Sequence, residues 1–410
     1  MLSPLFLSAF VWQLGMIDIY LYHFIVILFA PILFFHCTNI SKNLVFTFLC
    51  LFSISAINVI LGNVNFSGML KQLVNIIIFY YFYYLVFASI KYNIIKIFKI
   101  YLSISFFLAL SAILQFMISL VDISLIKTLE LLIPSYRVST DSFGLYRAQS
   151  IFQEPSHYCL VLSPAIYISV FNIFTKKRIL IGKTKAIIIL ISVILSASST
   201  GYLSILICMF FLFTIGSKIN YKAFYIASSI ILALSSYYIF PDLKLRINDL
   251  FIGLFIIDTQ NLNDINLSSY ALVNNINVAY HNFMQNPLIG SGLGSHGFGF
   301  EKYAFFVDDT FRQLNRYDAG SLLLRIFSEM GLVGLFCLFF FLKAYRVGYS
   351  KSNHPDSKIV IINNSALIYI LVTFFRGGNY TALGLPFFIW LYILSFRKNN
   401  ESNFYKLQKV

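Results

Sequence analysis

Residues 147–157 form a polar stretch in which Arg147, Glu154 and His157 place a guanidinium, a carboxylate and an imidazole within eleven residues. A long apolar run follows, and Pro155 suits the first turn of a helix, where its missing N–H costs nothing. A helix beginning there puts Glu154 beside the positive end of the helix dipole. Either Glu154 caps this helix and His157 anchors it at an interface, or the guanidinium binds an anion while the carboxylate or the imidazole accepts a proton.

A second charged group lies inside an apolar run further along the chain. Arg325 and Glu329 are four residues apart, so they share one face of a helix. Charge within a membrane is costly, so the pair is expected to face the protein interior or a wet cavity, either as a structural ion pair or as part of a site. Asp318 precedes this run. Arg376 ends the next run, where it is either an interfacial anchor or a further anion ligand.

The stretch 280–294 contains His281 and a glycine-rich run with Gly290 and Gly292. Such glycines can cradle a phosphate, but they follow no strand of a βαβ unit and no Walker lysine accompanies them, so a nucleotide-binding fold is not supported. The alternatives are a tight turn that needs positive φ and a backbone nest for a lipid pyrophosphate. His281, Gly290 and Gly292 are therefore candidate substrate contacts.

The composition indicates what must position these residues. Of the 410 residues, 59% are hydrophobic and 11% are charged, and the mean hydropathy is +0.80, whereas soluble domains carry about 25% charged residues. The apolar residues form repeated runs near the length that crosses a bilayer. We therefore predict an all-α polytopic membrane protein with twelve transmembrane helices, at residues 3–15, 19–37, 43–61, 72–90, 98–120, 156–174, 186–199, 201–216, 223–240, 320–342, 359–375 and 381–396.

The basic residues are distributed unevenly between the predicted loops. One set of loops and the C-terminal tail hold 19 of the 30 Lys and Arg residues, which marks the cytoplasmic side and places both termini there. The positive charge then reflects topology and contact with anionic membrane lipid, and no nucleic-acid partner is expected. The predicted divisions are N-terminal helices 1–120, a first long periplasmic segment 121–155, central helices 156–240, a large periplasmic loop 241–319, C-terminal helices 320–396 and a cytoplasmic tail 397–410.

Three arginines lie on different predicted spans or at their entrances, all at the outer face of the membrane: Arg147, Arg325 and Arg376. Guanidiniums at one depth suit a pyrophosphate, which takes bidentate, charge-assisted hydrogen bonds. Four further ionisable groups fall at the same level, where a carboxylate or an imidazole can deprotonate a sugar hydroxyl: Glu154, His157, Asp318 and Glu329. The five cysteines lie in apolar runs without metal-ligand spacing, so no metal site is expected.

Four motifs, in this order, resemble those of Wzy-type O-antigen or capsule repeat-unit polymerases, which share a superfamily with the O-antigen ligases. They are Arg147…Ser150-Ile151-Phe152…Glu154-Pro155-Ser156, Ser198-Ser199-Thr200-Gly201, Asn286-Pro287-Leu288-Ile289-Gly290-Ser291-Gly292 and Ser321-Leu322-Leu323-Leu324-Arg325…Glu329-Met330-Gly331-Leu332-Val333-Gly334. The resemblance covers residues 98–396. It implies a glycosyltransferase of GT-C-like helical architecture that needs no cofactor. Such an enzyme takes a growing glycan from undecaprenyl pyrophosphate and joins it to the next lipid-linked repeat unit on the periplasmic face.

The resemblance also bears on individual residues. Related ligases carry a functional histidine just before the tenth span, whereas this chain has Tyr317-Asp318 there, which favours a polymerase and leaves the identity of the base open. Some relatives have an arginine before the glycine of the second motif. Here Thr200 precedes Gly201, so that phosphate contact is either missing or supplied by Arg147.

We therefore predict an inner-membrane repeat-unit polymerase in which Arg147, Arg325 and Arg376 bind the donor pyrophosphate and Glu154, His157 or Asp318 activates the acceptor hydroxyl. The expected partners are the undecaprenyl-pyrophosphate-linked oligosaccharide and a chain-length regulator and flippase of the same pathway. One alternative is an O-antigen ligase that transfers glycan to lipid A core. The other is a lipid-linked oligosaccharide flippase or transporter, but its charges should lie deep in many spans, and here they cluster at the outer ends.

Overall fold

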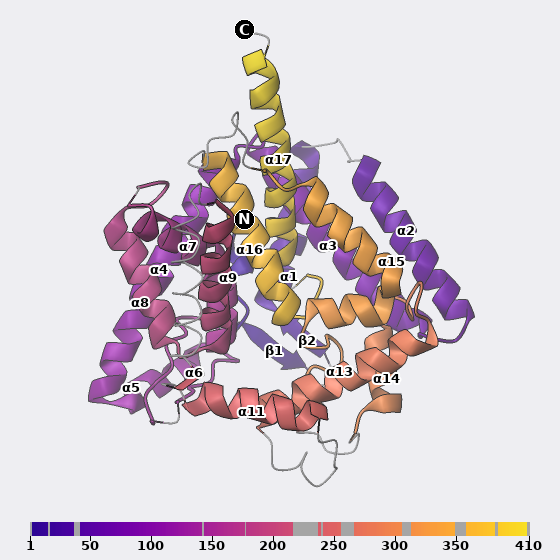
Figure 1. Ribbon diagram of the computed structural model, residues 1–410, viewed down its shortest axis with the longest axis horizontal. Helices are drawn as coiled ribbons and strands as arrows, with labels where there is room; N and C mark the ends of the chain where they lie inside the picture. Colours follow the sequence, from indigo (N-terminus) through magenta and orange to yellow (C-terminus); the bar gives the residue numbers. More distant parts are fainter. Residues whose placement is uncertain are drawn as a thin grey trace.

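The computed structural model describes residues 2–14, 17–36, 42–141, 143–176, 178–215, 237–238, 241–255, 266–305, 313–348, 358–381 and 384–407. Most helices run along one common direction (Figure 1). Three helices lie across one end of this bundle: α11 (Pro241–Phe255), α13 (Leu267–Gln285) and α14 (Ser295–Tyr303). The C-terminal helix α17 (Leu385–Leu407) projects from the opposite end.

Five helices are long and apolar enough to cross a membrane: α3 (Phe66–Ser89), α4 (Ile94–Val121), α7 (Pro155–Phe174), α15 (Leu322–Ala344) and α16 (Lys358–Phe375). Shorter apolar helices lie within α1 (Leu21–His36), α2 (Lys42–Ile60) and α9 (Ser199–Ile215). The chain is thus a polytopic membrane protein. The break predicted near residues 198–201 is confirmed, because α8 (Lys183–Leu195) ends before α9 begins. The predicted span 223–240 lies outside the described residues except for 237–238.

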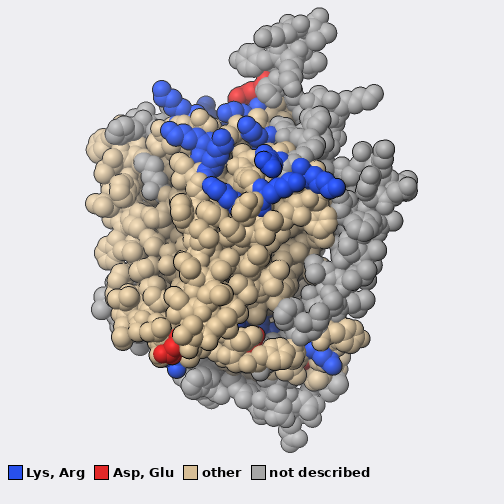
Figure 2. All heavy atoms as spheres, turned by 90° about the vertical axis from the view of Figure 1, so that its left-hand side faces the viewer, with Lys and Arg blue, Asp and Glu red and all other residues tan. Residues whose placement is uncertain are grey.

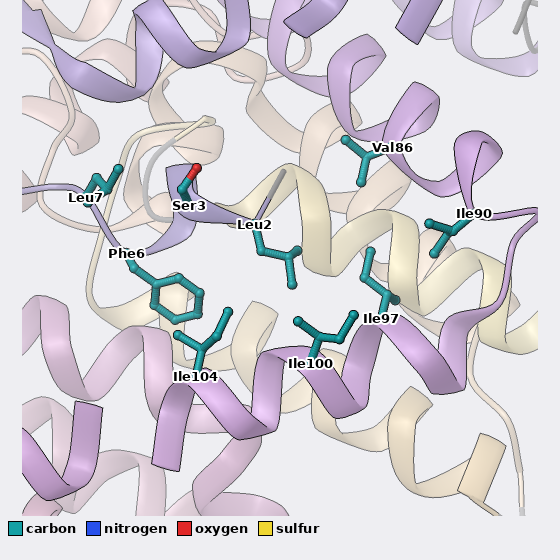
Figure 3. Close-up of a pocket in the computed structure, with 9 residues that line it drawn as sticks. All are labelled: Leu2, Ser3, Phe6, Leu7, Val86, Ile90, Ile97, Ile100 and Ile104. Carbon is teal, nitrogen blue, oxygen red and sulfur yellow. The ribbon is translucent and has the colours of Figure 1, made fainter. Parts of the chain in front are cut away.

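The prediction of a transmembrane helix at 3–15 is wrong. A 3-10 turn, η1 (Ser3–Leu5), is followed by an antiparallel hairpin of β1 (Val11–Leu14) and β2 (Ile17–Tyr20). These strands are rich in β-branched and aromatic residues, which favour strands, and a short apolar run is ambiguous between helix and strand. η1 forms one side of an apolar groove of about 500 Å³, and α3 and α4 form the other (Figure 3).

The centre of the bundle is formed by α7 and α16. Every residue of α7 from Tyr158 to Asn172 is buried, as expected for a helix that is apolar all round and enclosed by other helices. It packs against α8, α9 and α16, and α16 packs against α17. The first residues of α7 and α9 and the residue after α16 therefore lie close together at one end of the bundle.

The loop 287–292 completes a break in α15. Gly331 has φ 58° and ψ −151°, so the helical hydrogen bonds are interrupted there. The N–H groups of Leu332 and Val333 donate to the carbonyls of Pro287 and Leu288, at 2.9 and 3.0 Å. In return, the N–H groups of the loop at 291 and 292 donate to the carbonyls of residues 328 and 329, at 3.1 and 2.9 Å. Backbone groups within a membrane must be satisfied by protein, and this loop satisfies them.

The charges on the surface separate the two ends of the molecule. Figure 2 shows Lys and Arg gathered at the end from which α17 projects, above a broad belt without charged residues on the face shown. The opposite end carries both signs of charge. It also holds the short helices α5 (Ile123–Lys127) and α6 (Leu129–Leu132) (Figure 1).

Candidate active site

A cavity of about 310 Å³ lies at the end of the bundle that carries α11. It is lined by four arginines, one carboxylate and several hydroxyl groups, from Arg137, Ser139, Arg147, Gln153, Glu154, Pro155, Ser156, Ser198, Ser199, Arg246, Ser268 and Arg376. These residues come from the segment before α7, the start of α7, the junction of α8 and α9, the helices α11 and α13, and the residue after α16. The sequence places them up to 239 positions apart, between Arg137 and Arg376, and the bundle brings them together.

Arg147 is fixed against the end of α8. Its Nη2 and Nε atoms donate to the carbonyls of Ala197 and Ser196, at 3.1 and 3.4 Å. Ser196 is the C-cap of α8, so the guanidinium meets the negative end of that helix dipole, where a cation is favourable. The side chain remains half-buried on the cavity wall.

Two further guanidiniums share one hydroxyl group. Ser199 Oγ, at the first residue of α9, accepts hydrogen bonds from Arg376 Nη2 at 2.9 Å and from Arg246 Nη1 at 3.3 Å. The Nε atom of Arg246 is buried and has no hydrogen-bond partner within the described part of the chain. Burial, and then the neighbouring Arg246, lower the pKa of Arg376, and the carboxylate of Glu154 partly offsets this effect. An unpaired donor beside like charges is a chemistry that suits an anion.

Glu154 presents its carboxylate to the same cavity. It is the N-cap residue of α7, and Pro155 occupies the first turn as predicted, but the Glu154 side chain makes no capping hydrogen bond. Its Oε2 instead accepts a hydrogen bond from Ser156 Oγ at 3.0 Å, and the residue is exposed. The capping interpretation is therefore wrong, and the carboxylate is accessible to a molecule in the cavity.

His157 and Asp318 lie close to the cavity but do not line it. The Nδ1 atom of His157 is buried without a hydrogen-bond partner. Asp318 Oδ1 accepts a hydrogen bond from the Gly320 N–H at 3.0 Å. Burial raises the pKa of Asp318, although the Gly320 N–H, Arg325 and His157 act in the opposite direction.

Arg325 and Glu329 form the ion pair that their spacing predicts, and it is buried rather than facing the cavity. Arg325 Nε lies 3.1 Å from Glu329 Oε1, and the two residues are 2% and 0% exposed. The guanidinium lies over the ring of Tyr380, 4.5 Å from its centroid, and the Tyr380 hydroxyl donates to Glu329 Oε2 at 3.0 Å. Removing one member of such a buried ion pair strongly destabilises a protein, because it leaves the other charge buried without compensation.

The same pair holds the segment that carries Arg376. Arg325 Nη1 donates to the carbonyl of Gly378 at 3.1 Å, two residues after Arg376. The Gly377 N–H donates to the carbonyl of Gly320 at 3.0 Å. Gly378 packs so closely on Asp318 that a Cβ atom there would overlap the Asp318 carbonyl oxygen. Arg325 therefore acts at a distance from the cavity, through the backbone that positions Arg376.

The candidates in the stretch 280–294 lie elsewhere. His281 is exposed on α13 and stacks on Tyr303, with ring centroids 5.0 Å apart. Gly290 and Gly292 adopt positive φ, +68° and +90°, as the tight-turn interpretation requires. Their N–H groups donate to the carbonyls of Asn286 and Glu329, which leaves neither for a phosphate. These glycines support the break in α15.

Several polar residues at or near the site were not singled out by the sequence. Arg137 and Arg246 lie in the long segments between predicted spans, where no apolar run marks their depth. The signal for Arg246 is the amphipathic pattern of α11. His296 is fully buried, with Nε2 2.8 Å from Asn275 Oδ1. The amide nitrogen of Asn275 donates to two carbonyls, so Nε2 carries the proton of His296. Burial, and then Arg325, lower the pKa of His296 to about 3.

The fold and the cavity define a polytopic membrane protein with an arginine-rich site at one end of its bundle. Residues 185–339 match the model of the Wzy_C family, which is described as O-antigen ligase. No curated protein and no solved structure matches the chain. This part of the chain is therefore similar to the Wzy_C family, in agreement with the resemblance that the motifs indicate. The matched region contains Ser199, Arg246 and the Arg325–Glu329 pair.

Proposed function

We propose that this protein polymerises undecaprenyl-pyrophosphate-linked oligosaccharide repeat units into O-antigen or a related surface polysaccharide. The observation that carries the proposal is the cavity with guanidiniums from Arg137, Arg147, Arg246 and Arg376 beside the carboxylate of Glu154. A diphosphate that links a lipid to a sugar is a doubly charged anion, and guanidiniums bind such oxygens with bidentate hydrogen bonds. An arginine-rich cavity in a protein of this family suits that donor.

In the proposed reaction, the bond between the anomeric carbon and the pyrophosphate oxygen breaks. The acceptor hydroxyl oxygen forms the new glycosidic bond, and undecaprenyl pyrophosphate leaves with one additional negative charge. Arg246 and Arg376, which already converge on Ser199, would stabilise that charge where it develops. Glu154 is the carboxylate on the cavity wall and is our choice for the base that takes the acceptor proton. His157 and Asp318, which do not line the cavity, are the alternative candidates for the base.

The proposed orientation rests on the charges at the two ends. The Lys- and Arg-rich end around α17 would face the cytoplasm under the positive-inside rule. The cavity, at the end with α11, would then open to the periplasm of an inner-membrane protein, where lipid-linked repeat units are joined. A GT-C-like arrangement of the remaining predicted spans and a cytoplasmic C-terminus complete this proposal. A flippase and a chain-length regulator would be partners.

A second function has a specific observation in its favour, because the matching family is described as O-antigen ligase. A ligase would use the same donor site and transfer the glycan to lipid A core. The two functions differ only in the acceptor. Purified protein supplied with the lipid-linked repeat unit alone should therefore form ladders of increasing length if it is a polymerase, whereas a ligase needs lipid A core.

The same assay tests the cavity. Arg246→Ala should raise the KM for the lipid-linked donor by roughly 10- to 150-fold, because a charge-assisted hydrogen bond contributes roughly 1.5–3 kcal/mol. Arg178→Ala is the matched control, since Arg178 is exposed and is not among the residues lining this cavity. Wild-type donor KM in the alanine variants of Arg246, Arg376 and Arg137 alike would exclude the cavity as the donor site. If the wild-type protein makes product only when lipid A core is supplied, the protein is a ligase and the polymerase proposal is wrong.

A further inference from the structure

A second cavity, of about 500 Å³, lies between the turn that joins α3 to α4 and the exposed side of α17. It is lined by Tyr84, Lys91, Tyr92, Leu394, Arg397, Lys398 and Glu401. Lys and Arg gather at this end of the molecule, opposite to the arginine cavity (Figure 2). None of its residues takes part in the proposed reaction.

The charges that line this cavity are not balanced. Three cations, Lys91, Arg397 and Lys398, face one carboxylate, Glu401. Among the described residues, no ion pair within 4.0 Å joins Glu401 to any of them. The cavity therefore carries a net positive charge that can interact with an anion from outside.

The shape of the cavity is built by a turn that L-amino acids rarely adopt. Lys91 and Tyr92 both have φ 54°, although neither is glycine, and L-residues seldom adopt this left-handed backbone. The turn is closed by hydrogen bonds from the N–H groups of Lys91 and Tyr92 to the carbonyls of Ala88 and Phe87, both at 2.9 Å. This turn places the cation of Lys91 and the ring of Tyr92 on the same cavity.

The base of the cavity combines apolar surface with a hydroxyl group. Tyr84 and Leu394 are buried, and the ring of Tyr84 packs against Trp390 at 5.2 Å between centroids. The hydroxyl of Tyr92 donates to the Tyr84 oxygen at 3.4 Å. Because the Tyr84 oxygen accepts in that contact, its own O–H can donate to another acceptor. A cationic rim above an apolar base with a hydroxyl donor suits an amphipathic anion, with its phosphate at the rim and its glycerol and acyl part below.

We infer that this cavity binds the phosphate headgroup of an anionic phospholipid in the leaflet that meets the Lys- and Arg-rich end. Basic pockets between membrane helices on that side bind such headgroups. A free phosphate would use the same cations but not the apolar base, and the following experiment separates these two sources.

The test uses the purified full chain in a neutral detergent and native mass spectrometry. Phosphatidylglycerol and phosphatidylcholine with the same acyl chains are titrated in parallel with inorganic phosphate and glycerol phosphate. The wild type should bind one phosphatidylglycerol in preference to phosphatidylcholine. Arg397→Gln with Lys398→Gln should weaken that binding by about 30-fold, since each cation near an anionic lipid contributes about 1 kcal/mol and 1.36 kcal/mol is tenfold.

The control is Lys96→Gln with Lys99→Gln, which removes two exposed charges at the same end but outside the cavity. It should bind phosphatidylglycerol like the wild type. Tyr84→Phe, which keeps the ring, should weaken binding several-fold. Equal weakening in the two double variants, or no preference for phosphatidylglycerol in the wild type, would overturn the inference. Displacement of the lipid by stoichiometric inorganic phosphate or glycerol phosphate would overturn the lipid as the occupant.

Discussion

Replacing Arg325 by alanine should reduce the stability of the protein before it affects chemistry. The substitution leaves the Glu329 carboxylate buried, with the Tyr380 hydroxyl as its one remaining hydrogen-bond partner among the described residues. It also removes the donor to the Gly378 carbonyl. Loss of one member of a buried ion pair costs about 3–5 kcal/mol, which is a large share of the roughly 5–15 kcal/mol that stabilises a typical protein. Arg325→Ala should therefore accumulate poorly and unfold at a lower temperature.

A double substitution separates this loss from the effect on the site. Arg325→Met with Glu329→Gln removes both charges, and the glutamine oxygen can still accept from Tyr380. Neutral replacement of a buried pair is often tolerated, so the double variant should recover most of the lost thermal stability. The segment 376–380 still lacks its donor at Gly378, so Arg376 is held less firmly. We expect a donor KM raised by about tenfold with little change in kcat, which corresponds to about 1.4 kcal/mol of lost donor binding.

The measurements are thermal unfolding in detergent and polymerisation with purified lipid-linked donor, both normalised to folded protein. Lys343→Ala, an exposed change on the same helix, is the control and should resemble the wild type. An Arg325→Ala protein with wild-type unfolding temperature would refute the energetic argument. A stable double variant with wild-type donor KM would refute the positioning of Arg376.

Three further predictions follow from other contacts. Glu154→Gln should lower kcat by about 10²–10⁴-fold if Glu154 is the base, while thermal unfolding should not change because its side chain makes no capping bond; wild-type kcat would contradict this role. Gly290→Ala should unfold much more easily, because a Cβ would lie 2.4 Å from the Glu329 backbone at φ +68°; Gly68→Ala, which meets nothing within 4 Å, is the control. The pKa of His296 is lowered to about 3 in the folded protein, so His296 stays neutral there. In the unfolded chain its pKa returns to the ordinary 6.5, so it becomes protonated below that pH. Stability should therefore fall as the pH drops from 6.5 towards 3, by up to about 5 kcal/mol, and His296→Gln should show a smaller fall in pH-dependent unfolding measurements.

The sequence indicates that the site residues lie near the ends of predicted spans, but it does not show that these residues come together in one cavity. Glu154 and Arg376 border apolar runs and Arg147 lies in the polar stretch that precedes one, and the length of such a run indicates depth in a bilayer. Whether groups at one depth share a cavity depends on which helices are neighbours. Here the packing of α7 against both α9 and α16 brings them together, and this packing leaves no periodic signal in a single sequence.

Helix orientation and packing, which a single sequence does not reveal, also account for the residues that were misplaced or missed. Arg325 has the depth of the other arginines, but the face of its helix turns towards Glu329 and Tyr380 instead of the cavity. Arg246 reaches the cavity from α11, which lies across the end of the bundle, so no run of apolar residues marks its position. The structure has a hairpin at residues 11–20 where the sequence predicted a helix. An apolar run this short is compatible with either a helix or a strand, so its length does not decide between them.

The first half of α15 links the two arginines that converge on Ser199. On one side, Arg325 binds the carbonyl of Gly378 and so holds the segment of Arg376. On the other side, Ser328 accepts a hydrogen bond from Asn282 at 2.8 Å, which joins α15 to α13. Ser269 of α13 then donates to the carbonyl of Arg246 at 3.1 Å. Both guanidiniums are thus held by one short helical segment, which follows the N-cap residue Ser321 and ends at the break at Gly331. Because the loop 287–292 satisfies the backbone at that break, the segment is fixed at both ends. We therefore expect the arginine cavity to be preformed rather than assembled by the donor, which favours stabilisation of the leaving group without reorganisation.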